Sequence, residues 1–290
     1  MPPIRKITLL FHERHRGAER LRYRVWAMAE HWKARGVRMA TAWGLGDHGE
    51  TDLLFPHLEL SWIPDDYWAL LQSRAAVVNR HVRDIRKPVF STCLLARGDD
   101  YDGAVIVKTA CNCGGRLDEL LLGPNRRGIP LARTMRRIAR IAWVERRRLG
   151  RARTLGRYHI FPSSRAVPDA AFDNPHLVVE RFVPERRGER FVLRMCHFFG
   201  DRHSARVMTS TDPQVKSWNA RLEERIEPPE AVLELRARLR LDYGKIDYVV
   251  RDGMPIVLDV NTTPTMSSPL DAGAIERSAA LAAGLSWFER

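Results

Sequence analysis

The sequence predicts an α+β fold in which a small α/β domain precedes a larger region rich in strands. The first observation behind this is the order strand, helix, strand over residues 7–11, 18–35 and 37–43, followed by a short apolar segment at 52–55. The second is a series of four strand candidates from Leu177 onward, which ends in a hairpin. Long Gly/Ser-rich linkers are absent, so we expect the parts to pack on each other.

The composition is that of an ordinary folded protein with an unusual charge. The chain has 290 residues, enough to bury a sizeable core in two or three subdomains. It is 44% hydrophobic and 29% charged, and it contains no run of about 18 apolar residues that would predict a transmembrane helix. The formal net charge is +13 and rests almost entirely on arginine, which predicts attraction to anions such as nucleotides, acidic substrates, nucleic acid or anionic lipid.

The cysteines and the first residues bear on the compartment. Four cysteines in a chain of this length do not form a disulfide framework, so reduced thiols in the cytoplasm are expected. The pair Cys111 and Cys113 could touch a soft metal ion, but no second cysteine pair supports a zinc site. The beginning of the chain lacks the apolar stretch of a signal peptide, which agrees with a cytoplasmic location.

The most informative segment is an expected hairpin formed by residues 245–250 and 256–261. Strand alternation places Asp259 and Asn261 on one face, and Asp247 joins them only if the loop has an odd number of residues. A three-residue loop over 251–253, with Gly253 left-handed at a bulge, meets that condition. Three oxygen ligands on one face suit Mg²⁺, whereas the alternative is a surface hairpin with solvated ends.

A second segment joins a lysine to a glycine turn. The apolar strand at 104–108 ends in Lys108, and Gly114 and Gly115 follow shortly afterwards. A lysine on a rigid strand and glycines that let backbone N–H groups approach an anion are typical of phosphate binding. The alternative is an ordinary turn or linker, and the spacing is not that of a Walker loop.

The third segment is the apolar strand 177–183, which contains Glu180 and is followed by Pro184 and Glu185. It could form a hinge that offers backbone groups to an adenine edge, with Glu185 on the ribose hydroxyls. The alternative is an edge strand with solvated glutamates.

The order of the three segments resembles the ATP-grasp superfamily of the carboxylate–amine ligase type, from about residue 84 to the end of the chain. Residues 261–268 are similar to the C-terminal motif of D-alanine–D-alanine ligases. The resemblance implies an ATP-grasp fold with a preceding Rossmann-like domain at 1–88, a small subdomain at 89–180 and a C-terminal subdomain with the Mg-binding hairpin at 181–290. Thr265 and Asp259 depart from the commoner Gly and Glu, which puts the identity of the substrate in doubt.

The resemblance also implies a role for each matching residue, with ATP and Mg²⁺ as cofactors. Those expected at the nucleotide are Lys87, Lys108, Gly114, Gly115, Glu180, Arg181, Phe182, Val183 and Glu185, with Glu189 as a competing choice for the ribose. Those expected at the metal are Asp247, Asp259 and Asn261, and Arg194 and Lys216 are expected as catalytic anion contacts.

The implied function is an ATP-dependent ligase that joins a small-molecule or peptide carboxylate to an amine or a thiol through an acyl-phosphate. A small-molecule kinase on the same scaffold is one alternative, and a basic nucleic-acid- or membrane-associated protein with a degenerate nucleotide fold is another. The second alternative draws on the arginine-rich amphipathic helix expected at 131–154, which could also be a solvated face or a rim that attracts an acidic substrate.

Overall fold

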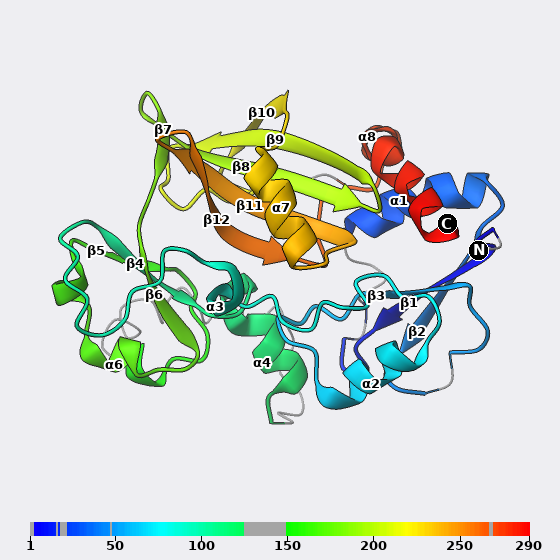
Figure 1. The fold of residues 1–290 in the computed structure, drawn as a ribbon, viewed down its shortest axis with the longest axis horizontal. Helices are drawn as coiled ribbons and strands as arrows, with labels where there is room; N and C mark the ends of the chain where they lie inside the picture. Colours follow the sequence, from blue (N-terminus) through cyan, green and yellow to red (C-terminus); the bar gives the residue numbers. More distant parts are fainter. Residues whose placement is uncertain (1–2, 16, 18–21, 47, 125–148, 267–268) are drawn as a thin grey trace. The chain divides into compact units, whose positions relative to one another are not determined.

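The computed structural model describes residues 3–15, 17, 22–46, 48–124, 149–266 and 269–290 (Figure 1). The chain forms two compact units: unit 1 comprises Met1–Asp84 and Glu185–Arg290, and unit 2 comprises Ile85–Pro184. The division into three segments at residues 88 and 180 stays a prediction.

Unit 1 begins with a parallel sheet of order β2-β1-β3, built from β1 (Lys6–Phe11), β2 (Arg38–Trp43) and β3 (Leu53–Pro56). Helix α1 (Arg24–Ala34) connects the first two strands, so the expected order of strand, helix and strand is confirmed. Helix α2 (Asp65–Ser73) follows the sheet.

Helix α1 begins at Arg24 because the residues directly before it are extended. Tyr23 forms an antiparallel bridge with Thr265, and the N–H of Met266 donates to the carbonyl of Arg22 at 2.7 Å. This pairing ties the entrance of α1 to the segment that follows Asn261.

The second part of unit 1 is an antiparallel sheet of order β10-β9-β8-β11-β12, with β7 paired to β8. Its strands are β7 (Glu185–Arg187), β8 (Arg190–Phe199), β9 (Arg202–Ser210), β10 (Arg221–Ile226), β11 (Tyr243–Arg251) and β12 (Met254–Asn261). Helix α7 (Glu230–Arg238) contacts β12, and α8 (Ala272–Ala282) packs against α1, β8 and β9 (Figure 1). The chain ends in the 3₁₀ helix η5 (Ala283–Glu289).

The parallel and antiparallel sheets of unit 1 share one core. Phe55 of β3, Phe199 of β8 and Tyr243 of β11 are fully buried, and the rings of Phe55 and Tyr243 meet edge to face at 4.8 Å between centroids. Trp32 of α1 joins them through Phe199, with 5.4 Å between the ring centroids. Aromatic contacts of this kind stabilise beyond the area they bury, which fixes the ends of β8 and β11 against the first sheet.

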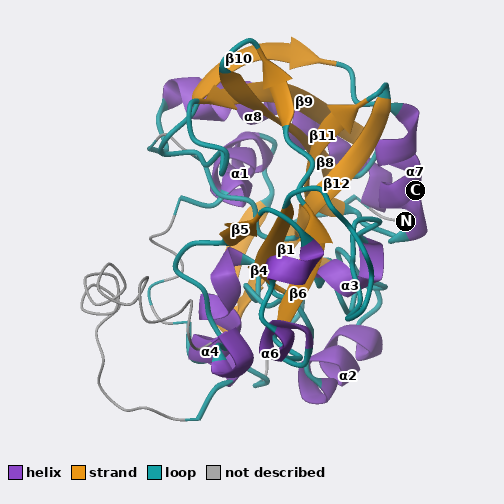
Figure 2. Cartoon of the chain, turned by 90° about the vertical axis from the view of Figure 1, so that its left-hand side faces the viewer, coloured by secondary structure: helices purple, strands orange, loops and turns teal. Residues whose placement is uncertain are grey.

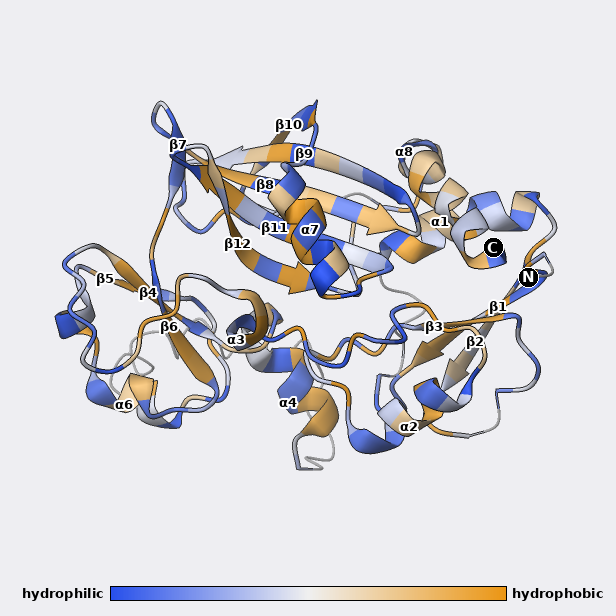
Figure 3. Cartoon of the chain, in the orientation of Figure 1, coloured by the Kyte–Doolittle hydropathy of each residue, from blue (hydrophilic) through white to orange (hydrophobic). Residues whose placement is uncertain are grey.

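Unit 2 is built on an antiparallel sheet of order β5-β4-β6 (Figure 2). Its elements are α3 (Lys87–Phe90), β4 (Val105–Thr109), η2 (Cys113–Gly115), α4 (Arg116–Leu122), η3 (Leu149–Arg151), β5 (His159–Phe161), η4 (Ser164–Ala166), α6 (Asp169–Phe172) and β6 (Leu177–Arg181). The apolar stretches of β4 and β6 stand out in Figure 3, and one face of the sheet forms the core with Val105, Val107 and Val179.

Three expectations about unit 2 meet different outcomes. The sequence at 89–91 also predicts a strand, which is wrong, because residues 87–90 form helix α3 with Pro88 in its first turn. Strand β6 ends at Arg181 rather than Val183. The arginine-rich helix expected at 131–154 lies mostly outside the described residues, which resume at Leu149. No helix in the described part of the chain is long and apolar enough to span a membrane.

Asn79 gives a test of how the loop before unit 2 is fixed. Its side chain accepts from the N–H groups of Asp242 and Tyr243 at 2.8 and 3.0 Å and donates to the carbonyl of Tyr243 at 2.8 Å. We expect Asn79→Ala to lower the free energy of unfolding by about 1–3 kcal/mol, because buried backbone groups at the start of β11 lose their partners. Denaturant unfolding measures this loss. Ser73→Ala, at an exposed helix end, is the control and should change stability by less than about 0.5 kcal/mol.

Candidate functional site

The register of the β11–β12 hairpin decides which side chains meet. The turn has two residues, Asp252 and Gly253, with φ of 53° and 77°, so the expected three-residue loop is wrong. Strand pairing shifts by one residue between Asp247 and Tyr248, because β12 contains a bulge at Leu258. The extra residue that was expected in the loop is thus Leu258, inside the strand. Asp247 therefore lies directly opposite Asp259.

The Asp247 carboxylate is buried and only half satisfied. Its Oδ2 accepts from the Lys245 ammonium at 2.7 Å, whereas its Oδ1 is buried without a hydrogen-bond partner. Burial raises the pKa of Asp247, and the negative charge of Asp259 raises it further, against the opposing charge of Lys245. An unpartnered carboxylate oxygen beside a second carboxylate fits a hard divalent cation such as Mg²⁺.

Asn261 continues the same face and has a structural role in this state. Its Oδ1 accepts from the N–H and the hydroxyl of Thr263 at 2.7 and 3.1 Å, which stabilises the turn after β12. Its role as a cation ligand stays a prediction. Within the described residues no group of three His, Cys, Asp or Glu side chains could hold a metal, so the expected set is two carboxylates completed by Asn261 or by other oxygens.

Two lysines lie near Asp247. Lys216, named from the sequence, comes from the loop between β9 and β10, and its charge lowers the pKa of Asp247. Lys245 was missed, although it could have been found, because a residue two positions before Asp247 on a strand shares its face.

Glu185 and Arg194 bind each other. The guanidinium of Arg194 donates to both carboxylate oxygens at 2.6–3.1 Å, and the N–H of Val250 donates to Oε2 at 2.7 Å. The pair therefore links β7, β8 and β11. For Glu185 to bind a ribose, or Arg194 to bind an anion, as predicted from the sequence, some of these hydrogen bonds would have to break. Glu189, the competing choice for the ribose, lies exposed between β7 and β8.

In unit 2 the main feature is a buried ion pair between Lys108 of β4 and Glu180 of β6, whose side chains are 7% and 3% exposed. Ile106 is opposite Glu180 and Lys108 is opposite Val178, so the pair lies on the face of the sheet away from the Val105 and Val107 core. The Oε1 of Glu180 is buried without a partner. A buried carboxylate oxygen of this kind is able to accept a hydrogen bond from a ligand.

Two backbone N–H groups after Glu180 already donate hydrogen bonds within unit 2. The N–H groups of Arg181 and Phe182 donate to the carbonyls of Cys93 and Ala104, both at 2.8 Å. The segment is thus held in place at Arg181 and Phe182, before Val183, which was expected at the adenine.

The glycine turn after β4 has a structural explanation. Gly114 and Gly115 have φ of 67° and 72°, and a Cβ on either would lie 2.3 or 2.7 Å from the carbonyl oxygens of Leu155 and Arg153. Both glycines are buried, so close backbone packing requires them here, and their contact with phosphate stays a prediction.

Lys87 and the cysteine pair lie close by. The ammonium of Lys87 is buried and donates to the carbonyl of Cys111 at 3.3 Å. Cys111 is partly exposed and Cys113 is exposed.

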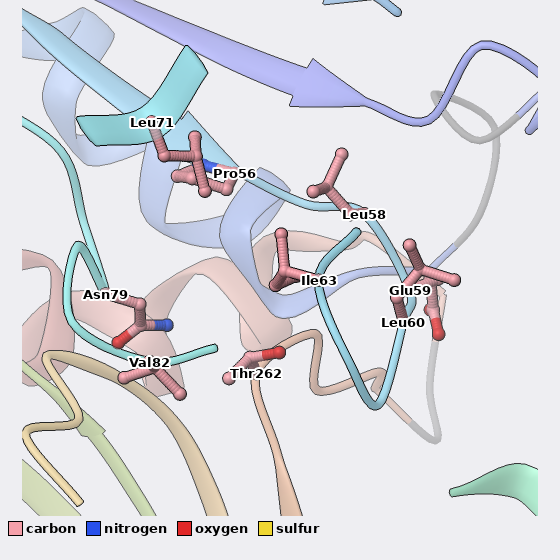
Figure 4. A pocket seen from close by; sticks show the side chains of 9 residues that line it. All are labelled: Pro56, Leu58, Glu59, Leu60, Ile63, Leu71, Asn79, Val82 and Thr262. Atoms are coloured by element: carbon pink, nitrogen blue, oxygen red, sulfur yellow. The ribbon is translucent and has the colours of Figure 1, made fainter. Parts of the chain in front are cut away.

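Unit 1 also contains a small pocket beside the end of β3, shown in Figure 4. It is lined by Pro56, Leu58, Glu59, Leu60, Ile63, Leu71, Asn79, Val82 and Thr262. The lining is mainly apolar, and Thr262 directly follows Asn261, so the pocket lies next to the end of the carboxylate-bearing strand.

Comparison with solved structures shows the fold. D-cycloserine synthetase DcsG matches 96% of this chain and 99% of its own at 14% identity, with a TM-score of 0.50. A RimK domain ATP-grasp protein from Sphaerobacter thermophilus matches 98% and 100% at 12% identity, with a TM-score of 0.49. D-alanine–D-alanine ligase from Bacillus anthracis matches 98% and 96% at 13% identity, also with a TM-score of 0.49.

No family model and no curated protein sequence matches the chain. At 14% identity the structural likeness concerns the fold alone, and the chain has the ATP-grasp fold with a preceding small parallel sheet, as expected from its sequence.

The Lys108–Glu180 pair predicts a difference between single and double variants. Glu180→Leu should lower the free energy of unfolding by about 3–5 kcal/mol, because it leaves the Lys108 charge buried and unpaired. Lys108→Met with Glu180→Leu should be closer to the wild type, since the double variant buries no charge. Denaturant unfolding compares the three proteins, and a Glu180→Leu variant as stable as the wild type contradicts the assignment.

The raised pKa of Asp247 predicts that Mg²⁺ binds more weakly as the pH falls. A cation binds the carboxylate and not the acid, so protons compete with Mg²⁺ at a higher pH than at an ordinary aspartate. Stabilisation by Mg²⁺ is expected to be full above the raised pKa and to be lost as the pH falls through it. Thermal unfolding with and without Mg²⁺ between about pH 5 and 8 checks this. A shift in melting temperature that stays constant over this interval is the contrary result.

Proposed function

We propose that the protein is a Mg·ATP-dependent ligase that joins a carboxylate to an amine. The observation that supports this most strongly is Asp247 directly opposite Asp259, with a buried carboxylate oxygen that has no partner. A folded protein leaves such an oxygen unsatisfied at a cost of about 1–3 kcal/mol, and a bound cation removes that cost.

Unit 2 would hold the nucleotide base. The free Oε1 of Glu180 can accept from the amino group of adenine, and the adjacent Lys108 ammonium can donate to a ring nitrogen or a phosphate oxygen. With the N–H groups of Arg181 and Phe182 bonded to neighbouring carbonyls, Val183 would be the next residue to offer its backbone to the base.

When bound, Mg·ATP would supply a γ-phosphoryl group to the substrate carboxylate with loss of ADP, and attack of the amine on the resulting acyl-phosphate would release inorganic phosphate. No nucleophile of the protein is consumed, which agrees with a site built from carboxylates and cations. The residues contribute by positioning the reactants and neutralising charge, as is usual for phosphoryl transfer.

Each residue of unit 1 would have a distinct part. Asp247 and Asp259 would hold the cation, with Asn261 released from Thr263 as a further oxygen ligand. Lys216 and Lys245 lie near Asp247 and would offset negative charge on the transferring group. Arg194 would act on the site by fixing Glu185 and, through it, the N–H of Val250 on β11.

A matched pair of variants tests the proposal. We expect Asp259→Asn to reduce turnover by at least about 100-fold while the protein stays folded, because the cation loses a charged ligand. Asp252→Asn in the same hairpin should leave turnover unchanged, since its carboxylate is exposed and its one ion pair among the described residues is with Arg251. The measurement is release of ADP and inorganic phosphate in a screen of carboxylates with amino acids, together with circular dichroism of both variants.

The products decide between the classes of function. Substrate-dependent ADP with stoichiometric free phosphate supports the ligase, whereas ADP without free phosphate indicates a kinase. If calorimetry detects no binding of Mg·ATP at millimolar concentration, the proposal fails, and the reading as a basic protein with a degenerate nucleotide fold takes its place.

A further inference from the structure

One face of the antiparallel sheet carries Asp247 and Asp259, and we call it the carboxylate face. A second group of charged side chains, all of them basic, lies near these two carboxylates. We call it the cationic cluster and define it as Arg24, His197, Arg206, Arg225 and Arg277. Its members come from the start of α1, from β8, β9 and β10, and from α8, all within unit 1.

The strand register brings the sheet members together. Arg206 is directly opposite Arg225, and on its other side it pairs with Met195, which in turn is opposite Asp247. His197 pairs with Lys245, the partner of Asp247. Residues directly opposite each other share a face, so the cationic cluster lies on the same side of the sheet as Asp247 and Asp259.

The two helical members of the cationic cluster are Arg24 of α1 and Arg277 of α8. Helix α8, which carries Arg277, packs against β8 and β9. The N–H of Arg24 donates to the carbonyl of Pro264 at 2.9 Å, so the side chain of Arg24 starts beside the segment that follows Asn261. Burial lowers the pKa of Arg24, and the positive charges of Arg206 and Arg277 lower it further.

Such an arrangement is unfavourable in the free protein. Like charges directly opposite on antiparallel strands destabilise a sheet, and Arg206 and Arg225 form such a pair. Burial and the charges of Arg24, Lys245 and Arg206 together lower the pKa of His197 well below its ordinary value. Among the described residues no carboxylate pairs with Arg24, Arg206 or Arg225.

One polar group in the cationic cluster also lacks a partner. The Nε of Arg24 is buried without a hydrogen bond. His197 is buried as well, at 5% exposed. Buried polar groups are almost always satisfied in folded proteins, so the Nε of Arg24 points to a ligand that supplies an acceptor.

We propose that the acid substrate carries a second anionic group, a carboxylate or a phosphate, and that the cationic cluster binds this group beside the metal-binding face. The inference rests on the proposed function for the reacting carboxylate, but binding of the second anion does not require turnover. The pocket at the end of β3 cannot take this role, because its lining is apolar and its only charged member is Glu59. A macromolecular polyanion fits less well, since Arg24 Nε and His197 are buried and a phosphate backbone binds exposed side chains.

An isosteric series of acids tests the proposal on the full chain. Butyrate has one carboxylate, succinate replaces its methyl group with a second carboxylate, and 3-phosphonopropionate replaces it with a phosphonate. We expect at least one dianion to bind at least 10-fold more tightly than butyrate in calorimetric titrations with and without Mg·ADP. Arg206→Gln and Arg277→Gln should each reduce that preference by about 10-fold, because each removes a charge-assisted contact. Arg238→Gln, an exposed arginine on α7, is the charge-matched control and should leave it unchanged.

The outcomes separate this inference from the proposed function. Dianion binding that Arg206→Gln weakens and Arg238→Gln does not supports the cationic cluster, even if no acid stimulates ATP hydrolysis. Equal binding of butyrate and both dianions overturns it, even if butyrate supports ADP and phosphate release. Salt-sensitive binding of an RNA oligonucleotide that Arg206→Gln abolishes, without any dianion preference, also overturns it and assigns the cationic cluster to a nucleic acid.

Discussion

The carboxylate face depends on one extra residue in β12. Without the bulge at Leu258, a two-residue turn would set Asp247 against Leu258 and send the Asp259 carboxylate to the opposite face of the sheet. With it, the two carboxylates meet, Lys245 and Asn261 fall opposite each other, and His197 and Arg206 share their face. A bulge is a local loss of ladder pairing, so its presence in the middle of an otherwise regular hairpin marks a position where side-chain direction matters more than strand stability.

Three acidic or arginine side chains among the described residues each keep one buried polar atom without a hydrogen-bond partner: Asp247 Oδ1, Glu180 Oε1 and Arg24 Nε. Asp247 lies on β11, the strand that also carries Tyr243 of the aromatic core, so the packing of Phe55, Phe199 and Tyr243 fixes the strand that bears this carboxylate. Conflict between local electrostatics and the fold is expected where a ligand completes the structure.

Much of the fold could be predicted because its strands alternate or run apolar. β1 and β4 nearly matched their expected bounds, whereas β10 was missed because Arg221, Glu223, Glu224 and Arg225 give it no apolar pattern. The alternation of side chains along the two strands, together with one extra residue, predicted that Asp247, Asp259 and Asn261 share a face. The sequence did not show whether that extra residue lies in the turn or inside a strand. Tertiary partners were beyond prediction: nothing local indicates that Arg194 binds Glu185, that Glu180 pairs with Lys108, or that Gly114 faces the Leu155 carbonyl.

The function proposed for unit 1 depends on binding of a divalent cation by the Asp247–Asp259 pair. Mn²⁺ reports this directly by electron paramagnetic resonance, because bound Mn²⁺ loses the sharp signal of the hydrated ion. Titration of the wild type and of Asp247→Asn, both checked for folding by circular dichroism, needs no knowledge of the substrate. We expect saturable Mn²⁺ binding in the wild type, strengthened by ATP, and its loss in a folded Asp247→Asn variant. Equal Mn²⁺ affinity in the two proteins would contradict it.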